Sequence, residues 1–293
     1  HLLDLWSARA SMHGQDLVKS PESSRSGSPH LGSLVEHLRK TVRGQDEAIH
    51  TLAQQVCLGR NGLRMRADRV SSAVLLTGTT GTGKTLLAQQ LASFLGTDQL
   101  IRVDMAALNS DHLGATLLGA PPGYVGSQER NGWLTTGLQE TPRGVLLFDE
   151  VEKAHPDIFN ILLQVLDDGV LTDSRGRKVD FSNTIIIMTS NLGATALRDD
   201  KTVGFGAQDI SHNHQAMQSR IMEELKKAYR PEFINRIDEK VVFHSLEEEQ
   251  LREIVKIMVK PLVSALAEKG IDLKFQPAAL KHLAKDGYDV EMG

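Results

Sequence analysis

A glycine-rich segment that ends in lysine and threonine is the strongest chemical signal in this sequence. It is a complete G-x-x-x-x-G-K-[ST] pattern and reads Gly78-Thr79-Thr80-Gly81-Thr82-Gly83-Lys84-Thr85. Glycines let backbone N–H groups wrap phosphates, while the lysine reaches the outer phosphates and the threonine hydroxyl takes a Mg²⁺ position. The segment therefore predicts a nucleotide-phosphate site rather than a plain glycine-rich turn.

Polar residues follow two apolar runs that favour buried strands. Asp149 and Glu150 come directly after residues 145–148, and Asn191 comes shortly after residues 184–188. Behind a phosphate-binding loop, we expect Asp149 to orient Mg²⁺ through its water shell and Glu150 to polarise an attacking water. Without such a loop, the two carboxylates would indicate only a strand that ends in solvent. Asn191 is expected at the same sheet edge, in contact with the γ-phosphate or the water.

These residues require a sheet that brings several strand ends together. Short apolar or β-branched runs alternate with helical patterns, which favours a largely parallel sheet covered by helices on both faces. The expected strands are residues 73–76, 100–103, 145–148 and 184–188, and the expected helices are residues 86–94 and 156–166. The predicted fold is an α/β phosphate-loop core.

The pattern changes toward both ends of the chain. Residues 20–33 are rich in Ser, Gly and Pro, which predicts a flexible linker after an upstream remnant. After residue 244 the pattern is helical: Ser245 and Glu248 have the spacing of a capping box, and an apolar stripe continues to Leu266. We expect three parts: a remnant and linker (1–33), a large nucleotide-binding domain (34–244) and a partial, mostly helical lid domain (245–293).

Composition excludes several other classes of protein. The 293 residues carry a formal net charge of −4, which gives no general attraction to nucleic acid or to an anionic membrane. The longest apolar runs are too short to cross a bilayer. A single cysteine, Cys57, fits a reducing compartment, so we expect a cytoplasmic protein. Because they lie in a polar stretch, His212 and His214 are expected to be solvated rather than to bind a metal.

Beyond these motifs, long segments of the chain resemble the AAA+ ATPase superfamily, and in particular the second ATPase module of the Clp family of ring-forming unfoldases. The resemblance covers residues 42 to 293. Within that family the chain more strongly resembles the peptidase-partnered ClpC and ClpE types, with ClpB as the alternative. The segments that carry it are residues 42–48, 118–126, 148–157, 163–169 and 230–238.

The resemblance implies roles for residues outside the phosphate loop. It places Val42 and Arg43 near the adenine of ATP, although the family usually has an apolar residue where Arg43 stands. It makes Arg236 an arginine finger that reaches the neighbouring subunit's site, where a guanidinium would offset transition-state charge. The alternative for Arg236 is a surface ion pair with Asp238. Residues 235–238 also superficially resemble a guanine-reading motif, but the Clp-type context favours ATP.

Two further segments would do the mechanical work in such a protein. By resemblance, Gly123-Tyr124-Val125-Gly126 is the pore loop, in which Tyr124 grips an extended polypeptide. The apolar tripeptide Val203-Gly204-Phe205 is similar to a loop that docks on the ClpP peptidase, and the alternative is a loop anchored on its own domain. Gly293 matches the start of a Gly-Ala-Arg segment whose arginine contacts nucleotide, so we expect the chain to lack that arginine.

The function implied by the resemblance is Mg²⁺-dependent ATP hydrolysis coupled to unfolding of protein substrates by a homohexamer. We expect such a stress-response chaperone to feed the ClpP peptidase. A ClpB-type disaggregase that works without a peptidase is the close alternative. Two less favoured alternatives are a nucleic-acid motor and a nucleotide-binding fragment that does not hydrolyse ATP.

Overall fold

The computed structural model describes residues 29–63, 69–96, 100–107, 143–173, 176–192 and 210–287, with side chains from residue 219 onward in the last range. Two predicted functional segments, Gly123 to Gly126 and Val203 to Phe205, lie outside the described residues.

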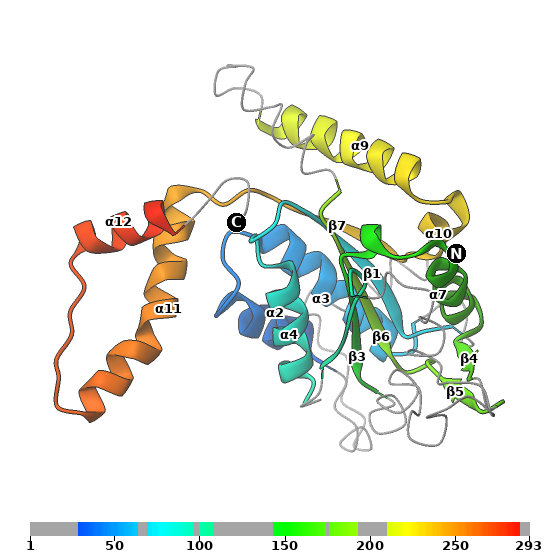
Figure 1. Ribbon diagram of the computed structural model, residues 1–293, viewed down its shortest axis with the longest axis horizontal. Coiled ribbons are helices and arrows are strands. Elements are labelled where there is room, and N and C mark those ends of the chain that lie inside the picture. Colours follow the sequence, from blue (N-terminus) through cyan, green and yellow to red (C-terminus); the bar gives the residue numbers. More distant parts are fainter. Residues whose placement is uncertain are drawn as a thin grey trace, which may run out of the picture.

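Five parallel strands form the central sheet, in the order β2-β3-β6-β1-β7 (Figure 1). The four strands expected from the sequence are present, with each boundary within two residues of the expected one, and the sheet is parallel as predicted. β7 adds an edge strand next to β1. The strands are β1 (Ser72–Gly78), β2 (Leu100–Asp104), β3 (Val145–Asp149), β6 (Ile185–Ser190) and β7 (Glu239–Phe243).

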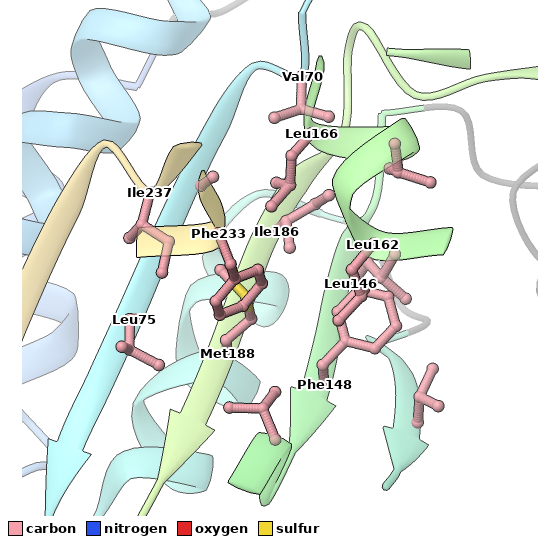
Figure 2. Close-up of a cluster of buried hydrophobic side chains, with 14 of the residues drawn as sticks. Val70, Leu75, Leu146, Phe148, Leu162, Leu166, Ile186, Met188, Phe233 and Ile237 are labelled. Carbon is pink, nitrogen blue, oxygen red and sulfur yellow. The ribbon is translucent and has the colours of Figure 1, made fainter. Parts of the chain in front are cut away.

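The central strands β1, β3 and β6 are buried along their whole length because both faces of the sheet are covered. Alternate residues of β1 enter different hydrophobic clusters: Leu75 lies in one and Leu76 in the other. One face is covered by α2 (Leu31–Arg39), α3 (Asp46–Arg60) and α4 (Lys84–Phe94). The other is covered by α7 (Pro156–Asp168), α9 (Ile210–Ala228) and α10 (Pro231–Arg236). Figure 2 shows this second face, where side chains of α7 and α10 meet those of β1, β3 and β6.

Local sequence explains where the helices next to the site begin. Pro156 is the first residue of α7, as expected, because its missing N–H needs no partner there, and His155 caps the helix by accepting from the backbone N–H of Asp157. Gly169 ends α7 in the left-handed conformation. A short hairpin of β4 (Val170–Thr172) and β5 (Lys178–Asp180) then leads toward β6. Three-residue strands carry too little periodicity to be predicted from sequence.

The helices α11 (Glu248–Glu268) and α12 (Pro277–Asp286) extend to one side of the sheet (Figure 1). The expected capping box of Ser245 and Glu248 is wrong: Glu247 is the N-cap residue and shares the reciprocal bonds with Gln250. A carboxylate can accept the same backbone N–H bond as a hydroxyl, so the N-cap position lies at Glu247, two residues after the expected Ser245. Among the described residues, no helix is long and apolar enough to cross a membrane.

Candidate nucleotide site

The phosphate loop joins β1 directly to α4, as predicted. Gly78, Gly81 and Gly83 all have positive φ, at 146°, 76° and 102°. Such angles are accessible to glycine and strained for other residues. A Cβ atom on Gly78 would also lie 2.5 Å from the carbonyl oxygen of Phe243, so β7 leaves no room for a side chain there. The loop leads directly into α4, and the first backbone N–H groups of that helix have no intrahelical partners.

Lys84 is buried at the first position of α4 and its ammonium group faces the loop. Nζ donates to the carbonyl oxygens of Gly78 at 2.8 Å and Thr79 at 2.7 Å, and to Oδ1 of Asn191 at 3.0 Å. Burial lowers the pKa of Lys84 to about 8, against the opposing effect of three nearby carboxylates, those of Glu152, Asp149 and Glu150. Lys84 and Asn191, predicted independently, are therefore in direct contact.

Asp149 ends β3 beside the first turn of α4. Its Oδ1 accepts from the hydroxyl of Thr85 at 3.3 Å and also from the hydroxyl of Thr189, while Arg102 Nη2 lies 2.6 Å from its Oδ2. A carboxylate beside a threonine hydroxyl is the hard oxygen set that Mg²⁺ prefers when phosphates supply its other ligands. The described residues hold no cluster of three or more metal-ligating side chains, and a cation bridged to phosphates does not need one.

Glu150 has a backbone conformation that is rare for its residue type, with φ of 57°. Its backbone N–H donates to the Thr189 hydroxyl at 3.0 Å. One carboxylate oxygen accepts from Asn191 Nδ2 at 3.1 Å, and the other lies 2.7 Å from Lys153 Nζ. Strained backbone of this kind is concentrated at functional sites, and here it directs the carboxylate toward Asn191 instead of continuing the strand.

Several residues of this cluster were missed by sequence reasoning. Arg102 and Thr189 both contact Asp149, and Glu152 accepts from the backbone N–H of Asn191 at 3.0 Å. Thr189 could have been found, because it precedes Asn191 at the end of a buried strand. The other two are ordinary charged residues whose placement depends on which strands pair.

An apolar cavity of about 430 Å³ lies between the phosphate loop and the two C-terminal helices. Gly81 contributes from the loop, and α11 and α12 contribute most of the rest. Its size suits a small ligand, and its lining suits a flat apolar group. The lining residues are Gly81, Leu246, Leu251, Ile254, Val255, Met258, Val259, Leu283, Ala284 and Gly287.

The segment predicted to contact the base lies between the loop and α11. Val42 is buried, and its Cγ1 would lie 3.7 Å from a Cβ atom on Gly83. Arg43 instead directs its guanidinium toward α11, with Nε 3.5 Å from Oε2 of Glu253. The structure thus brings Val42 to the loop and pairs Arg43 with Glu253 on α11.

Arg236 lies near the beginning of β1, whereas the loop follows the end of that strand. It ends α10, just before β7, and Asp238 exchanges hydrogen bonds with Ala73 at the beginning of β1. Its guanidinium pairs with Asp167 of α7, whereas the carboxylate of Asp238 accepts from the Ala73 backbone. Arg236 therefore forms its ion pair with Asp167 and not with Asp238, the partner that the alternative interpretation expected.

A phosphate loop between β1 and α4 of a five-stranded parallel sheet, next to two carboxylates and an asparagine at the ends of β3 and β6, defines a P-loop nucleotide-binding protein. Residues 69–240 match the family model described as an AAA domain of the Cdc48 subfamily, and residues 246–293 match the C-terminal D2-small domain of ClpB protein. The chain belongs to the AAA family of ATPases.

Curated relatives with similar sequences include several Clp proteins. The chain is 50% identical over 265 residues to the negative regulator of genetic competence ClpC/MecB of Bacillus subtilis, covering 90% of this chain and 32% of that protein. It is 48% identical over 265 residues to the chaperone protein ClpB of Oceanobacillus iheyensis, with the same coverage of 90% and 32%. The chain spans about a third of the length of these relatives.

A solved structure shares the fold. It is a cryo-EM reconstruction of Hsp104 with ATPγS and FITC casein in a closed state, with a TM-score of 0.78 and 37% sequence identity. The match covers 93% of this chain and 46% of that chain. The expected AAA+ fold, a mostly parallel sheet flanked by helices and followed by a helical small domain, is thus confirmed.

Proposed function

We propose that this chain is the ATP-hydrolysing module of a ring-forming Clp unfoldase. In this proposal the phosphate loop, residues 78–85, binds the triphosphate, and Val42 and Arg43 flank the base together with the apolar cavity beside Gly81. Thr85 and Asp149 would hold Mg²⁺, which neutralises phosphate charge when bound. The proposal rests on the contact between Thr85 and Asp149 and on the position of Lys84 between the loop and Asn191.

Glu150 is the proposed base for the attacking water. Both of its carboxylate oxygens have cationic or N–H partners, from Lys153 and Asn191. Each oxygen keeps a second lone pair, so Glu150 can accept from an attacking water while Lys153 and Asn191 hold the carboxylate in place. Asn191 is the proposed sensor, because it bonds both Lys84, at the phosphates, and Glu150.

The separation of Arg236 from the loop is the observation that carries the ring assignment. Ala73, which exchanges hydrogen bonds with Asp238, is five residues along β1 from Gly78, or about 17 Å at the usual rise of a strand. An arginine side chain does not reach that far along its own sheet. If Arg236 contacts a γ-phosphate, that phosphate must belong to a second copy of the chain, as in a closed ring.

The complete activity we propose is ATP-driven unfolding and threading of protein substrates by a homohexamer. The pore loop would be Gly123 to Gly126, with Tyr124 gripping the polypeptide, and Val203 to Phe205 would dock on the ClpP peptidase. The similarity to a relative from Staphylococcus saprophyticus, an ATP-dependent Clp protease ATP-binding subunit, supports the peptidase partnership. That relative is 44% identical over 292 residues, or 99% of this chain.

A disaggregase that works without a peptidase is the second candidate. Its support is the 48% identity to ClpB and the likeness to the Hsp104 structure. Both candidates use the same ATP site and the same pore loop, so they differ only at the docking segment, residues 203–205.

The test uses the full-length protein that contains this module. Glu150→Gln should retain ATP binding and lose hydrolysis, since the amide cannot accept the proton of water; retained hydrolysis would contradict the role of Glu150. Tyr124→Ala should keep most ATPase activity and stop unfolding of a folded fluorescent reporter. Degradation of the reporter by added ClpP, with and without residues 203–205, separates the unfoldase that feeds a peptidase from the disaggregase.

A further inference from the structure

Asp167 is the point where two arginines from different parts of the chain meet. Its Oδ1 forms an ion pair with Nε of Arg236 and lies 3.3 Å from Nη2 of Arg69. Asp167 lies in the last turn of α7, Arg236 ends α10, and Arg69 precedes β1. The side chain of Asp167 is 31% exposed and that of Arg236 is 37% exposed, so both side chains are partly open to solvent.

Packing beneath the pair fixes both backbones. Leu162 and Leu166 of α7 are almost completely buried against the sheet, and Phe233 of α10 lies in the same cluster, where its ring meets that of Phe159 edge-on at 5.2 Å. Figure 2 shows Leu162, Leu166 and Phe233 on the same face of the sheet. Because the two helices are held by shared core, Asp167 has a fixed position relative to the end of α10.

We propose that Asp167 is the positioning residue for Arg236, and this inference rests on the proposed role of Arg236 as an arginine finger. The ion pair engages Nε of Arg236. An arginine held through Nε still has its two terminal amino groups, the end that can bind phosphate oxygens in a bidentate way. Asp167 would thus orient the finger before the neighbouring subunit arrives.

Arg69 gives the arrangement a second function. When Arg236 contacts a phosphate, its positive charge is shared with the nucleotide, and Asp167 needs another cation to balance its own charge. Arg69 is already at 3.3 Å from the same oxygen. Because the carboxylate keeps a cationic partner in either state, it can orient Arg236 without holding it back from the phosphate.

The test compares Asp167 with the residue beside it. Asp168 is the next carboxylate of α7 and is exposed. In the full-length ring, Asp167→Asn should lower kcat by about tenfold and change the KM for ATP by less than about twofold, since a loosely held finger misplaces transition-state charge but not ground-state binding. Asp168→Asn should leave both constants unchanged. Asp167→Glu, which keeps the charge, should recover most of the lost kcat.

Comparison with Arg236→Ala separates this inference from the function on which it rests. Arg236→Ala should abolish turnover. Wild-type turnover in Arg236→Ala would contradict the finger itself. If Arg236→Ala is inactive and Asp167→Asn, folded with an unchanged melting temperature, turns over ATP at the wild-type rate, then Asp167 does not position the finger. If Asp167→Asn does not fold, Asp167→Glu is the deciding variant. An Asp167→Glu protein that folds like the wild type but has a kcat as low as that of Arg236→Ala would contradict the predicted rescue, because it would show that a carboxylate charge alone does not position Arg236.

Discussion

Nζ of Lys84 lies 3.0 Å from Oδ1 of Asn191, so the lysine of the phosphate loop contacts the asparagine after β6 directly. The same asparagine donates through Nδ2 to the carboxylate of Glu150 at 3.1 Å. Three residues from three parts of the chain are therefore linked in series, from the lysine to the proposed base. Any ligand that draws the ammonium group away from Asn191 frees an acceptor next to Glu150, which is how phosphate binding would be transmitted to the base.

Nucleotide affinity should depend on pH through Lys84. Burial lowers its pKa to about 8, so the neutral amine becomes the main form as pH rises above that value. Phosphates favour the charged form, so binding takes up a proton there, and the dissociation constant of ATP should rise by at most about tenfold per pH unit above the pKa. Titration with a fluorescent ATP analogue between about pH 7 and 9.5 measures this effect.

Lys84→Arg is the control for the pH experiment. A guanidinium stays charged throughout this range, so the variant should bind more weakly, because its shape differs, but with an affinity that does not change with pH. Equal pH dependence in the two proteins would assign the effect to some other group, and wild-type affinity that is flat from neutral pH upward would refute the shifted pKa.

Thr189 should matter for both carboxylates. Its hydroxyl donates to Asp149 and accepts from the backbone N–H of Glu150, and the residue is buried. Thr189→Val keeps the shape and removes both bonds, which should cost about 1–3 kcal/mol in the free energy of unfolding and most of the ATPase activity. Urea denaturation and a steady-state ATPase assay measure the two effects. Thr189→Ser, which retains the hydroxyl, should recover both, and full activity in Thr189→Val would show that the bonds are dispensable.

Gly78 should tolerate no side chain. It has φ of 146°, and a Cβ atom would lie 2.5 Å from the carbonyl oxygen of Phe243, so Gly78→Ala must displace β7 or the loop. We expect a loss of about 3 kcal/mol or more in the free energy of unfolding and weak ATP binding. Gly62→Ala is the matched control, because Gly62 has φ of 70° with nothing within 4 Å of its Cβ position. The control should lose only about 1–2 kcal/mol, the cost of the left-handed backbone alone; equal losses in urea denaturation would contradict the steric account.

Sequence reasoning found the residues whose chemistry is local. The phosphate loop, Asp149 and Asn191 each follow a strand that an apolar run makes visible, and parallel strands bring those ends to one edge. It could not find contacts that depend on which strand lies next to which. Arg102 contacts Asp149 because β2 pairs with β3, a pairing with no local signal.

The two arginines assigned by resemblance show the same limit. Val42 lies beside Gly83, but its neighbour Arg43 pairs with Glu253, a residue about two hundred positions later. Arg236 pairs with Asp167, not with the nearby Asp238, because the carboxylate of Asp238 accepts from the backbone N–H of Ala73 in β1 instead. Side-chain partners of exposed charges follow from tertiary packing, which spacing in the sequence does not encode.

The most direct test of a site divided between two copies is a mixing experiment with full-length proteins. Glu150→Gln rings keep the finger and lack the base, whereas Arg236→Ala rings keep the base and lack the finger, so each should be inactive alone. Mixed at equal amounts and allowed to exchange subunits, they should recover up to about a quarter of the wild-type ATPase rate, because that share of interfaces joins an intact base to an intact finger. No recovery despite proven exchange of subunits would contradict catalysis across the interface.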